Sequence, residues 1–352
     1  MTQNDDTIND DTIIAAKQTA HRLLHGLAHG ADVKDAYHAD AHLWASHPFN
    51  KLQGHDAIQD VWCQLRAALP DMERRDSIFT GGYSKPDARM DARIDDNSLT
   101  GRLLIATMGH YQGTFTQDLC GIPATNGVVT IRSCEVHHIV DDKIAHSYML
   151  IDLLDLMRQA HVWPIAPSLG AEGAWHPPSG GAGFRLDQQD SAAGARAFDT
   201  VIDMHNALLT FDGKSLDSMQ HGAYWGATFL WYGPAGIGTT RGMDGFRAHH
   251  QIPFLTGFPD RRGAGHYIRI GDGNFVVTGG WPSVTGTHMG EWLGLPATGT
   301  HVEMRVMDFY HLVDGKITEN WVPIDILYIL YQMGFDVFAR LQHLRGNPKR
   351  DL

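Results

Sequence analysis

GIPATNGVVTIRSCEVHHIVDDKIAHSYMLIDLLDLMRQ, at residues 121–159, returns as GLPATGTHVEMRVMDFYHLVDGKITENWVPIDILYILYQ, at residues 294–332. The two copies align without a gap at an offset of 173 residues, and 15 of 39 positions are identical. A unit of this length is a whole domain rather than a solenoid repeat, which runs to roughly 20–50 residues. The sequence therefore predicts a duplicated domain, and the rest of the chain is interpreted as two versions of one fold.

Length and composition are typical of a globular protein of about two domains. The 352 residues carry a formal net charge of −12, which argues against a nucleic-acid partner because phosphate binding needs a basic face. No apolar run approaches the roughly 18–20 residues that span a bilayer, so no membrane partner is expected. The acidic N-terminus is unlike a signal peptide, and three cysteines without a metal or disulfide pattern suit a reducing compartment. The expected location is the cytoplasm.

Each copy places helices first and strands later, an order that favours an α+β fold with an antiparallel sheet. In the first copy, a helix at 11–29 precedes strands at 43–46, 78–83, 89–94, 103–111, 128–140 and 143–151 and a closing helix at 153–160. In the second copy, a helix at 191–209 precedes strands at 228–232, 266–270, 275–281, 302–313 and 316–324 and a closing helix at 327–344.

Residues 161–189 separate the copies and are rich in Pro, Gly and Ser, which is typical of a linker. We therefore expect a first domain at residues 1–160 and a second domain at residues 190–352. Trp163 and Trp175 indicate that the linker packs on a surface.

The strings GTHMGEWLGLPATG (286–299) and DFYHLVDGKITENWVPID (308–325) are similar to those of the SnoaL-like polyketide cyclases of the NTF2-like superfamily. In the first copy, GTFTQDLCGIPATNG (113–127) and EVHHIVDDKIAHSYMLID (135–152) resemble the family more loosely. The resemblance covers both expected domains but not the linker. It implies two tandem NTF2-like (cystatin-like) cones, each a curved antiparallel sheet wrapped around N-terminal helices.

The resemblance also implies a cofactor-independent acid–base enzyme that closes a ring by intramolecular aldol condensation. The pocket aspartate of the family maps onto Asp325 and onto Asp152, where Tyr148 replaces the tryptophan of the W-x-x-x-D motif. The assisting histidine maps onto His311 and His138. Since family members commonly pair through their sheets, the two halves are expected to form an intramolecular pseudo-dimer.

An aldol reaction needs a base that takes a proton next to a carbonyl and an acid that protonates the new alkoxide, and one carboxyl group can do both in turn. Burial raises the pKa of a carboxyl group toward the useful range. Apolar neighbours such as Trp321 and Ile324 make this plausible for Asp325. The alternative is that Asp325 and Asp152 only cap the helices that follow them.

The side chains that accompany Asp325 depend on the hairpin register, because a shift of one residue exchanges the two faces of a strand. With a two-residue turn at 314–315, Asp325 shares its face with Asp308, Tyr310, Glu319 and Trp321. With a three-residue turn at 313–315, it shares its face with Arg305, Phe309, His311 and Trp321. The second set is favoured because it matches the implied Asp/His pairing and adds a cation for an oxyanion. The sequence leaves both sets open.

The candidate substrate-binding residues are aromatic or recur at equivalent positions of the two copies: Trp321, Arg305, Trp231, Tyr148, Arg132, Trp44, His205 and His25. The plainer alternative for the arginines is an internal ion pair. For the tryptophans it is the core, since an aromatic ring buries a large area. For His138 and His311 it is a structural hydrogen bond.

Three histidines, His21, His25 and His29, follow one another at i, i+4 and i+8 on a predicted helix, so that two could chelate a metal ion. Neither an H-E-x-x-H motif nor a nearby set of carboxylates accompanies them. We therefore expect no metal site, and the resemblance to the cyclase family implies that no cofactor is needed.

The favoured function is a SnoaL-like cyclase, lyase or isomerase that acts on a small, mostly apolar carbonyl compound. The alternative is a non-catalytic NTF2-like module that binds a small molecule or a partner protein. A third possibility is that one half is active. The first half would then be the decayed one, since Tyr148, Asp142 and Cys134 depart from the pattern that the second half keeps.

Overall fold

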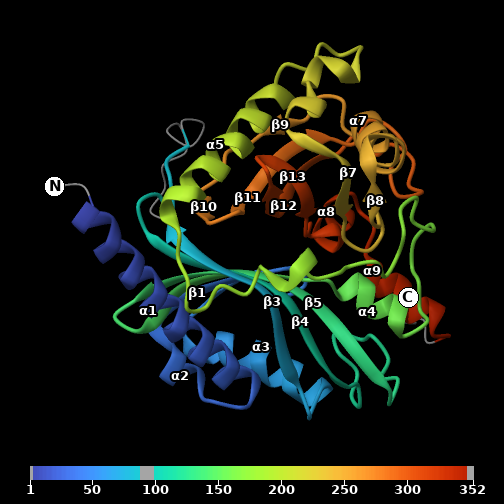
Figure 1. The fold of residues 1–352 in the computed structure, drawn as a ribbon. Helices are drawn as coiled ribbons and strands as arrows, with labels where there is room; N and C mark the ends of the chain where they lie inside the picture. The colour runs from blue at the N-terminus through green and yellow to red at the C-terminus, as the bar shows by residue number, and fades with distance from the viewer. Residues whose placement is uncertain (1–2, 88–98, 347–352) are drawn as a thin grey trace.

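The computed structural model describes residues 3–87 and 99–346, with side chains from residue 10 onward. Two curved sheets face one another; helices such as α1, α3, α5 and α7 lie on their outer sides, and α4 and α9 lie at one end of the seam (Figure 1). The α+β fold with two sheet-bearing halves is therefore confirmed. Among the described residues, no helix has the length and apolar character needed to cross a bilayer.

The first half carries the six-stranded sheet. Its helices are α1 (Gln3–Ala28), α2 (Val33–Ala36), α3 (His55–Ala68) and α4 (Leu153–Gln159). Its strands are β1 (Tyr37–Ala45), β2 (Lys51–Gln53), β3 (Glu73–Tyr83), β4 (Leu103–Thr114), β5 (Val128–Val140) and β6 (Lys143–Ile151).

The second half carries the seven-stranded sheet. Its helices are α5 (Ser191–Leu208), α6 (Gly242–Phe246), α7 (Ile252–Gly257), α8 (Ile326–Gln332) and α9 (Val337–Leu344), and a π-helical turn, Arg247–Gln251, joins α6 to α7. Short 3₁₀ turns lie at Ser179–Gly181 before it and at Leu216–Met219 and His221–Ala223 within it. Its strands are β7 (Trp225–Tyr232), β8 (Thr240–Arg241), β9 (Arg262–Gly263), β10 (Ile268–Asp272), β11 (Phe275–Thr287), β12 (His301–Val313) and β13 (Lys316–Trp321).

Both sheets are mixed, which corrects the expectation of a wholly antiparallel sheet. Strand β1 pairs with β6, and β7 with β13, in parallel, whereas the other pairs are antiparallel. A parallel neighbour needs a long connection, and here almost the whole half lies between the two strands.

Two further expectations are affected by the described structure. The single helix expected at 327–344 is wrong: α8 and α9 are separated by a turn in which Gly334 has a φ of 83° and Asp336 caps α9. Gly334 suits such a stop because it adopts positive φ without a steric penalty. The strand expected at 89–94 lies outside the described residues.

The hairpin between β12 and β13 turns through two residues, Asp314 and Gly315, both with positive φ, as a type I′ turn requires. Beyond the turn, the register shifts between the pair Leu312–Ile317 and the pair His311–Glu319. Thr318 is therefore an extra residue, a β-bulge. The first half has the same irregularity between β5 and β6.

The bulge exchanges the faces of the strands. The turn has two residues, as in the first alternative. Asp325 nevertheless shares its face with the side chains of the second alternative, because Arg305 pairs opposite Asp325 and Phe309 pairs opposite Trp321. Asp308 and Tyr310 consequently point to the other side of the sheet.

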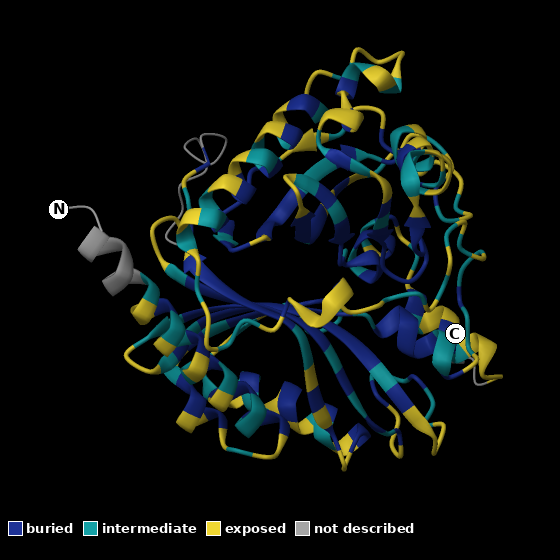
Figure 2. Cartoon of the chain, viewed as in Figure 1, coloured by how far each residue is buried: buried dark blue, intermediate teal, exposed yellow. Residues whose placement is uncertain are grey.

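The inner faces of the two sheets pack against each other. One apolar cluster draws on both halves and includes Trp44, Met108, Val136, Tyr148, Tyr267, Trp281, Met307, Phe309 and Trp321. The ring centroid of Tyr148 lies 5.4 Å from that of Tyr267 and 5.7 Å from that of Trp281. The strands that face the middle are largely buried (Figure 2). The remaining face of each sheet is directed to the helices of its own half.

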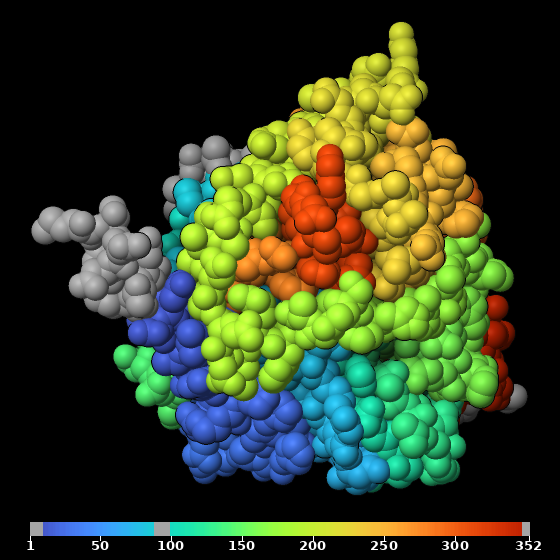
Figure 3. All heavy atoms as spheres, viewed as in Figure 1, coloured from blue at the N-terminus to red at the C-terminus, as the bar shows by residue number. Residues whose placement is uncertain are grey.

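The segment between the halves, residues 161–189, lies across the seam (Figure 3). It bridges to the second half at Ala171, which pairs with Thr239, and to the first half at Phe184, which pairs with Phe79. Lys17 of α1 is fully buried and forms a 2.6 Å ion pair with Asp272 at the end of β10. The expectation that this segment packs on a surface is confirmed.

Two aspartates hold the halves together reciprocally. Asp152 accepts a hydrogen bond of 2.9 Å from the backbone N–H of Ala235, in the second half, and Asp325 accepts one of 2.9 Å from the N–H of His47, in the first. Each aspartate also caps the helix that follows it and pairs with an arginine of its own half, Arg132 or Arg305. A single carboxylate thus satisfies a helix end, a guanidinium and a loop of the other half.

Asp325→Ala is expected to lower the free energy of unfolding by about 3–5 kcal/mol, because the Arg305 guanidinium remains buried without its counter-charge. Asp325→Asn keeps an acceptor for the α8 N-terminus and should lose less. Asp152→Ala is the matched variant, and its effect should be smaller because Arg132 retains Asp155 at 3.1 Å. Urea unfolding monitored by tryptophan fluorescence measures all three. A loss below about 1 kcal/mol for Asp325→Ala would contradict this account of the interface.

Candidate active site

A cavity of about 540 Å³ lies in the second half, between the helices and the outer face of the sheet. Its walls come from α5, the α6–α7 region and strands β7, β9 and β11–β13. The lining includes Met204, His205, Trp225, Trp231, Phe246, His250, Gln251, Phe254, Arg261, His266, Ser283, Val284, Met304, Val306, Asp308, Tyr310, Asn320 and Val322. A mostly apolar cavity with a few polar groups is the usual form of a small-molecule site.

Strand β12 supplies the centre of the site through its alternation. Val306, Asp308 and Tyr310 face the cavity, whereas Arg305 and Phe309 face the other half. Successive side chains of a strand point to opposite faces, so the β-bulge at Thr318 decides which acidic residue enters the cavity.

Asp308 is the acidic side chain of this lining. It lies deep within the half yet is only half-buried, because it borders the cavity. Burial raises its pKa to about 7, although hydrogen bonds from Tyr310 and Asn320 act in the opposite direction. A carboxyl group with this pKa exchanges its proton readily at neutral pH, as a general acid and base must.

A short relay connects Asp308 to a helix. Tyr310 hydrogen-bonds Asp308, and its hydroxyl lies 3.0 Å from His205 Nε2 on α5. When Tyr310 donates to the carboxylate, its oxygen accepts from His205. The relay orients the carboxyl group and donates hydrogen bonds to its charged form, which favours that form.

A second polar pair lies beside the relay. The ring of His266 is 5.4 Å from that of His205, and its Nε2 lies 2.6 Å from Ser283 Oγ. The first half anchors this corner, since Asp87 accepts a hydrogen bond from the His266 backbone N–H and pairs with Arg269 at 2.9 Å. The two halves therefore contribute jointly to the position of His266.

The wall that includes His250, in the π-helical turn, is aromatic and uncharged. The ring of His250 stacks on Trp231 at 3.9 Å, and burial lowers the pKa of His250 to about 3, so it is neutral. π-helical turns are rare and often occur at functional sites. The exposed lining residues that mark the mouth are Leu209, Gly213, Pro259, Arg262 and Gly263.

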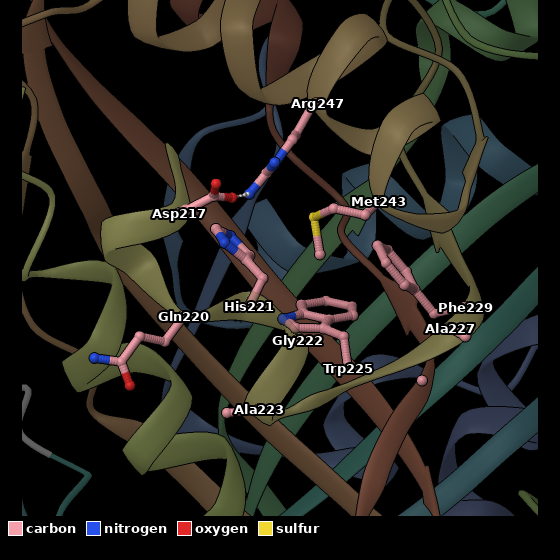
Figure 4. Close-up of a pocket in the computed structure, with 11 residues that line it drawn as sticks. Asp217, Gln220, His221, Gly222, Ala223, Trp225, Ala227, Phe229, Met243 and Arg247 are labelled. Atoms are coloured by element: carbon pink, nitrogen blue, oxygen red, sulfur yellow. Dashed lines mark hydrogen bonds and ion pairs between the residues drawn. The ribbon is translucent and has the colours of Figure 1, made fainter. Parts of the chain in front are cut away.

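A second pocket of about 430 Å³ adjoins the cavity and shares His221 and Trp225 with it. Figure 4 shows the indole of Trp225 and the ring of His221 on its floor, and the ion pair of 2.6 Å between Arg247 and Asp217 at one edge. Burial lowers the pKa of His221 to about 4. The pocket extends the space available beside the cavity with aromatic and neutral groups.

Side chains fill the equivalent positions in the first half. Strand β11 pairs Val284 with Gly263, and the equivalent pair on β4 and β3 is Tyr111 with Arg74. Arg74 forms an ion pair with Glu135 at 2.9 Å, and Glu135 is the repeat equivalent of Asp308. Tyr111 donates to the same carboxylate at 2.7 Å. A glycine and a valine thus stand in the second half where an arginine and a tyrosine occupy the first.

The two aspartates that the family motif indicates lie between the sheets. Asp325 and Asp152 border a small space of about 20 Å³ at the interface and are absent from the lining of the large cavity. Burial raises the pKa of Asp325 to about 6 against the opposing charge of Arg305, and it raises that of Asp152 against Arg132. Both cap helices, as the structural alternative proposes.

The two motif histidines also lie on the interface faces. His311 Nδ1 is 2.8 Å from Glu319, and its ring stacks on Phe275 at 4.6 Å. His138 pairs across the strands with His146, and burial, reinforced by Arg102, lowers its pKa to about 4. The structure therefore brings each histidine to the side of the sheet that carries its motif aspartate.

The other candidates divide between the interface and the interiors of the two halves. Trp321, Tyr148, Trp44, Arg132 and Arg305 lie at the interface; Trp321 stacks on Tyr232, and Arg305 lies over the Tyr328 ring at 3.4 Å. Trp231 and His205 line the large cavity. His25 belongs to the first half, where its Nε2 lies 3.2 Å from Asp76.

Of the cavity residues, Asp308 and Tyr310 were expected only as members of the less favoured set of neighbours, and Asn320, His250 and His266 were not expected at all. One signal was available: position 308 is acidic in both copies, as Asp308 and Glu135, and an acidic residue in the middle of an apolar strand needs a reason. The bulge at Thr318 had no recognisable signal, and without it the alternation assigns the wrong partners.

The family model described as SnoaL-like polyketide cyclase matches residues 90–160 and 208–333, more than half of the chain. None of the curated proteins matches the chain in sequence.

Many solved structures resemble one half of the chain. A SnoaL-like protein from Jannaschia sp. CCS1 is 19% identical, with a TM-score of 0.35, over 42% of this chain and 96% of its own. An NTF2-like protein from Burkholderia thailandensis E264 is 21% identical, with a TM-score of 0.32, over 39% and 96%. One from Burkholderia xenovorans LB400 is 18% identical, with a TM-score of 0.29, over 40% and 97%.

Val284→Tyr is expected to close the cavity by transferring the tyrosine of the first half to its equivalent position. Binding of a bicyclic ketone such as α-tetralone, measured by saturation-transfer NMR, should weaken at least tenfold because the ring has lost its space. Val284→Ala, which enlarges the cavity, is the matched control and should keep binding. Unchanged binding by the folded tyrosine variant would place the ligand elsewhere.

Proposed function

The chain belongs to the SnoaL-like polyketide cyclase family, and we propose that its second half is a cofactor-independent acid–base catalyst. Its substrate is a small, mostly apolar carbonyl compound held in the large cavity, and Asp308 is the general acid and base. The observation that carries this proposal is a carboxyl group with a pKa of about 7 on the wall of an apolar cavity.

The proposed reaction is an aldol-type ring closure. Ionised Asp308 takes a proton from the carbon next to a carbonyl, and the enolate attacks a second carbonyl of the same molecule. A carbon–carbon bond forms, and the protonated Asp308 returns its proton to the new alkoxide oxygen. Tyr310 and His205 support the carboxyl group through their hydrogen bonds, and no external oxidant or reductant is needed.

Asp308 is proposed in preference to the motif aspartate for reasons of access. The Asp325 carboxylate is occupied by Arg305, by the His47 N–H and by the start of α8, in a space too small for a substrate. Asp308 borders a volume that holds a bicyclic or larger molecule. Asp325 and His311 then act by fixing the sheet from its other side.

The first half is proposed as a structural partner. The Arg74 guanidinium and the Tyr111 ring occupy the space next to Glu135. Burial alone would raise the pKa of Glu135, but Arg74 and His137 lower it below its usual range, so this carboxylate stays ionised and paired. It lacks the proton that an acid catalyst returns.

Asp308→Asn is expected to reduce turnover by roughly 10²–10⁴-fold without loss of the fold, because the amide cannot exchange a proton. Hydrogen–deuterium exchange at the α-carbon of α-tetralone, monitored by proton NMR, tests this without knowledge of the natural substrate. In the native protein, kcat/KM for exchange should rise with pH and level off above pH 7, as Asp308 ionises.

Asp325→Asn is the control for this experiment and should retain exchange within about threefold, after correction for any unfolded fraction. Loss of exchange in Asp325→Asn with activity kept in Asp308→Asn would return the catalytic role to the motif aspartate. Ketone binding by both variants without exchange by the native protein would favour a binding module.

Asp308→Asn is also expected to stabilise the protein above neutral pH. The folded-state pKa of Asp308, about 7, exceeds its ordinary value of 3.8. The protonated Asp308 side chain therefore contributes fully to the free energy of unfolding below pH 4, and this contribution is lost as the pH rises through 7. The gain in Asp308→Asn should grow from little at pH 4 to on the order of 4 kcal/mol at pH 8, because each tenfold change in acid dissociation is worth about 1.4 kcal/mol, measured as the shift in melting temperature.

Glu135→Gln is the matched control, because its pKa is lowered instead of raised. This variant should destabilise the protein at neutral pH, where Arg74 keeps Asp76 but loses the second of its two carboxylate partners. Equal effects of the two variants at pH 8 would contradict the assignment of opposite roles.

A further inference from the structure

The fold brings a carboxylate to two histidines of α1. His21 and His25 lie one turn apart, and Asp76 approaches them from β3; the three ligand atoms lie within 4.8 Å of one another. His25 Nε2 is already 3.2 Å from Asp76 Oδ2. The sequence offered the histidine pair without a carboxylate, since Asp76 is more than 50 residues away along the chain.

We propose that His21, His25 and Asp76 form a zinc-binding site in the first half. Two imidazole nitrogens and one carboxylate oxygen are a frequent ligand set for Zn²⁺, and a water molecule completes the tetrahedron. The ion requires each ligand at about 2.0–2.2 Å, so its binding would need a rotation of the His25 ring, whose side chain is 31% exposed. The site lies outside the cavity of the second half and plays no part in the proposed acid–base step.

The charges around the site leave one carboxylate in excess. The Arg74 guanidinium binds Asp76 at 2.9 Å, but it also binds both oxygens of Glu135, at 2.9 and 3.0 Å. One positive charge thus faces two negative ones, and a dication meets a net negative environment. Arg74 also holds the Asp76 carboxylate in place, as hydrogen bonds to metal-ligating carboxylates commonly do.

The protonation states suit a metal. Burial would raise the pKa of Asp76, but Arg74 lowers it overall, so the carboxylate is ionised at neutral pH. Burial, followed by the neighbouring His25, lowers the pKa of His21 and keeps its ring neutral. Ligands must be deprotonated to bind, and the directions of both shifts favour the deprotonated forms of Asp76 and His21.

The packing fixes one ring and leaves the other adaptable. The His21 ring lies edge-on to Phe79 at 5.6 Å and to Phe184 at 5.8 Å, whereas the His25 side chain is 31% exposed. Phe184 belongs to the connecting segment. A zinc ion would therefore join α1 to β3 next to the point where this segment pairs with β3.

The test uses the full-length, untagged protein after treatment with a chelator, titrated with Zn²⁺ in a calorimeter. We expect one equivalent to bind, a rise in melting temperature on binding, and a Co²⁺ derivative with the intense visible absorption of tetrahedral coordination. His21→Ala and Asp76→Asn should each weaken zinc binding at least tenfold.

His29→Ala is the matched control, because this exposed histidine follows the end of α1, lies outside the set and should leave binding unchanged. His21→Ala removes a half-exposed helix residue and keeps the test valid if Asp76→Asn fails to fold. The absence of saturable binding by the native protein, or binding of equal strength by folded His21→Ala, would overturn the proposal. α-Tetralone exchange should be the same with and without zinc, which separates this test from that of the proposed function.

Discussion

Each sheet of this protein is buried on both faces, and most of the structure follows from that constraint. One face packs on the sheet of the other half, and the other face looks toward the helices of its own half. A strand in this position cannot leave a polar side chain to water, so each buried charge needs a partner or a purpose. At the interface the partner is explicit: Arg132 with Asp152, and Arg305 with Asp325. On the cavity side no arginine of the described residues forms an ion pair with Asp308, and burial raises its pKa to about 7, above the value of about 6 that Asp325 has beside Arg305.

The repeat predicted much of the fold from sequence because alternation and turn chemistry are local. The strand at 128–140 and its partner at 143–151 were predicted to the residue, since turn residues with positive φ separate two clear apolar runs. The break at Gly334 was missed because the apolar pattern continues on both sides of it. The partners of Asp325 could not be derived from local patterns, since one extra residue, Thr318, reverses the faces of a strand. The favoured set of neighbours of Asp325 was correct, but the three-residue turn assumed for it was wrong. These side chains lie on the face of the sheet that packs against the other half.

Duplication lets the two halves divide the roles of the interface and the interior. The motif that both copies keep, an arginine opposite an aspartate that caps a helix, serves the contact between the halves. Both copies retain it because each needs the other: Asp152 binds the Ala235 N–H, and Asp325 binds the His47 N–H. Positions that serve only one interior are free to diverge. Gly263 and Val284 stand opposite Arg74 and Tyr111 in the sheet register, and this difference in volume separates an open interior from a filled one.

Glu135 and Asp308 occupy the same repeat position, and the ion pair with Arg74, which only Glu135 has, sets their pKa values apart. Glu135 is compensated by Arg74, so ionisation stabilises the fold and the carboxylate becomes part of a fixed network with Tyr111 and His137. Asp308 lacks that charge, so ionisation costs stability, and the carboxyl group keeps a proton near neutral pH that it can give and take. A buried acid without a counter-ion is a liability for folding that proteins retain where chemistry needs it. Asp76 of the first half shares the positive charge of Arg74 with Glu135, so its negative charge is only partly compensated. A dication bound beside His21 and His25 would compensate the rest.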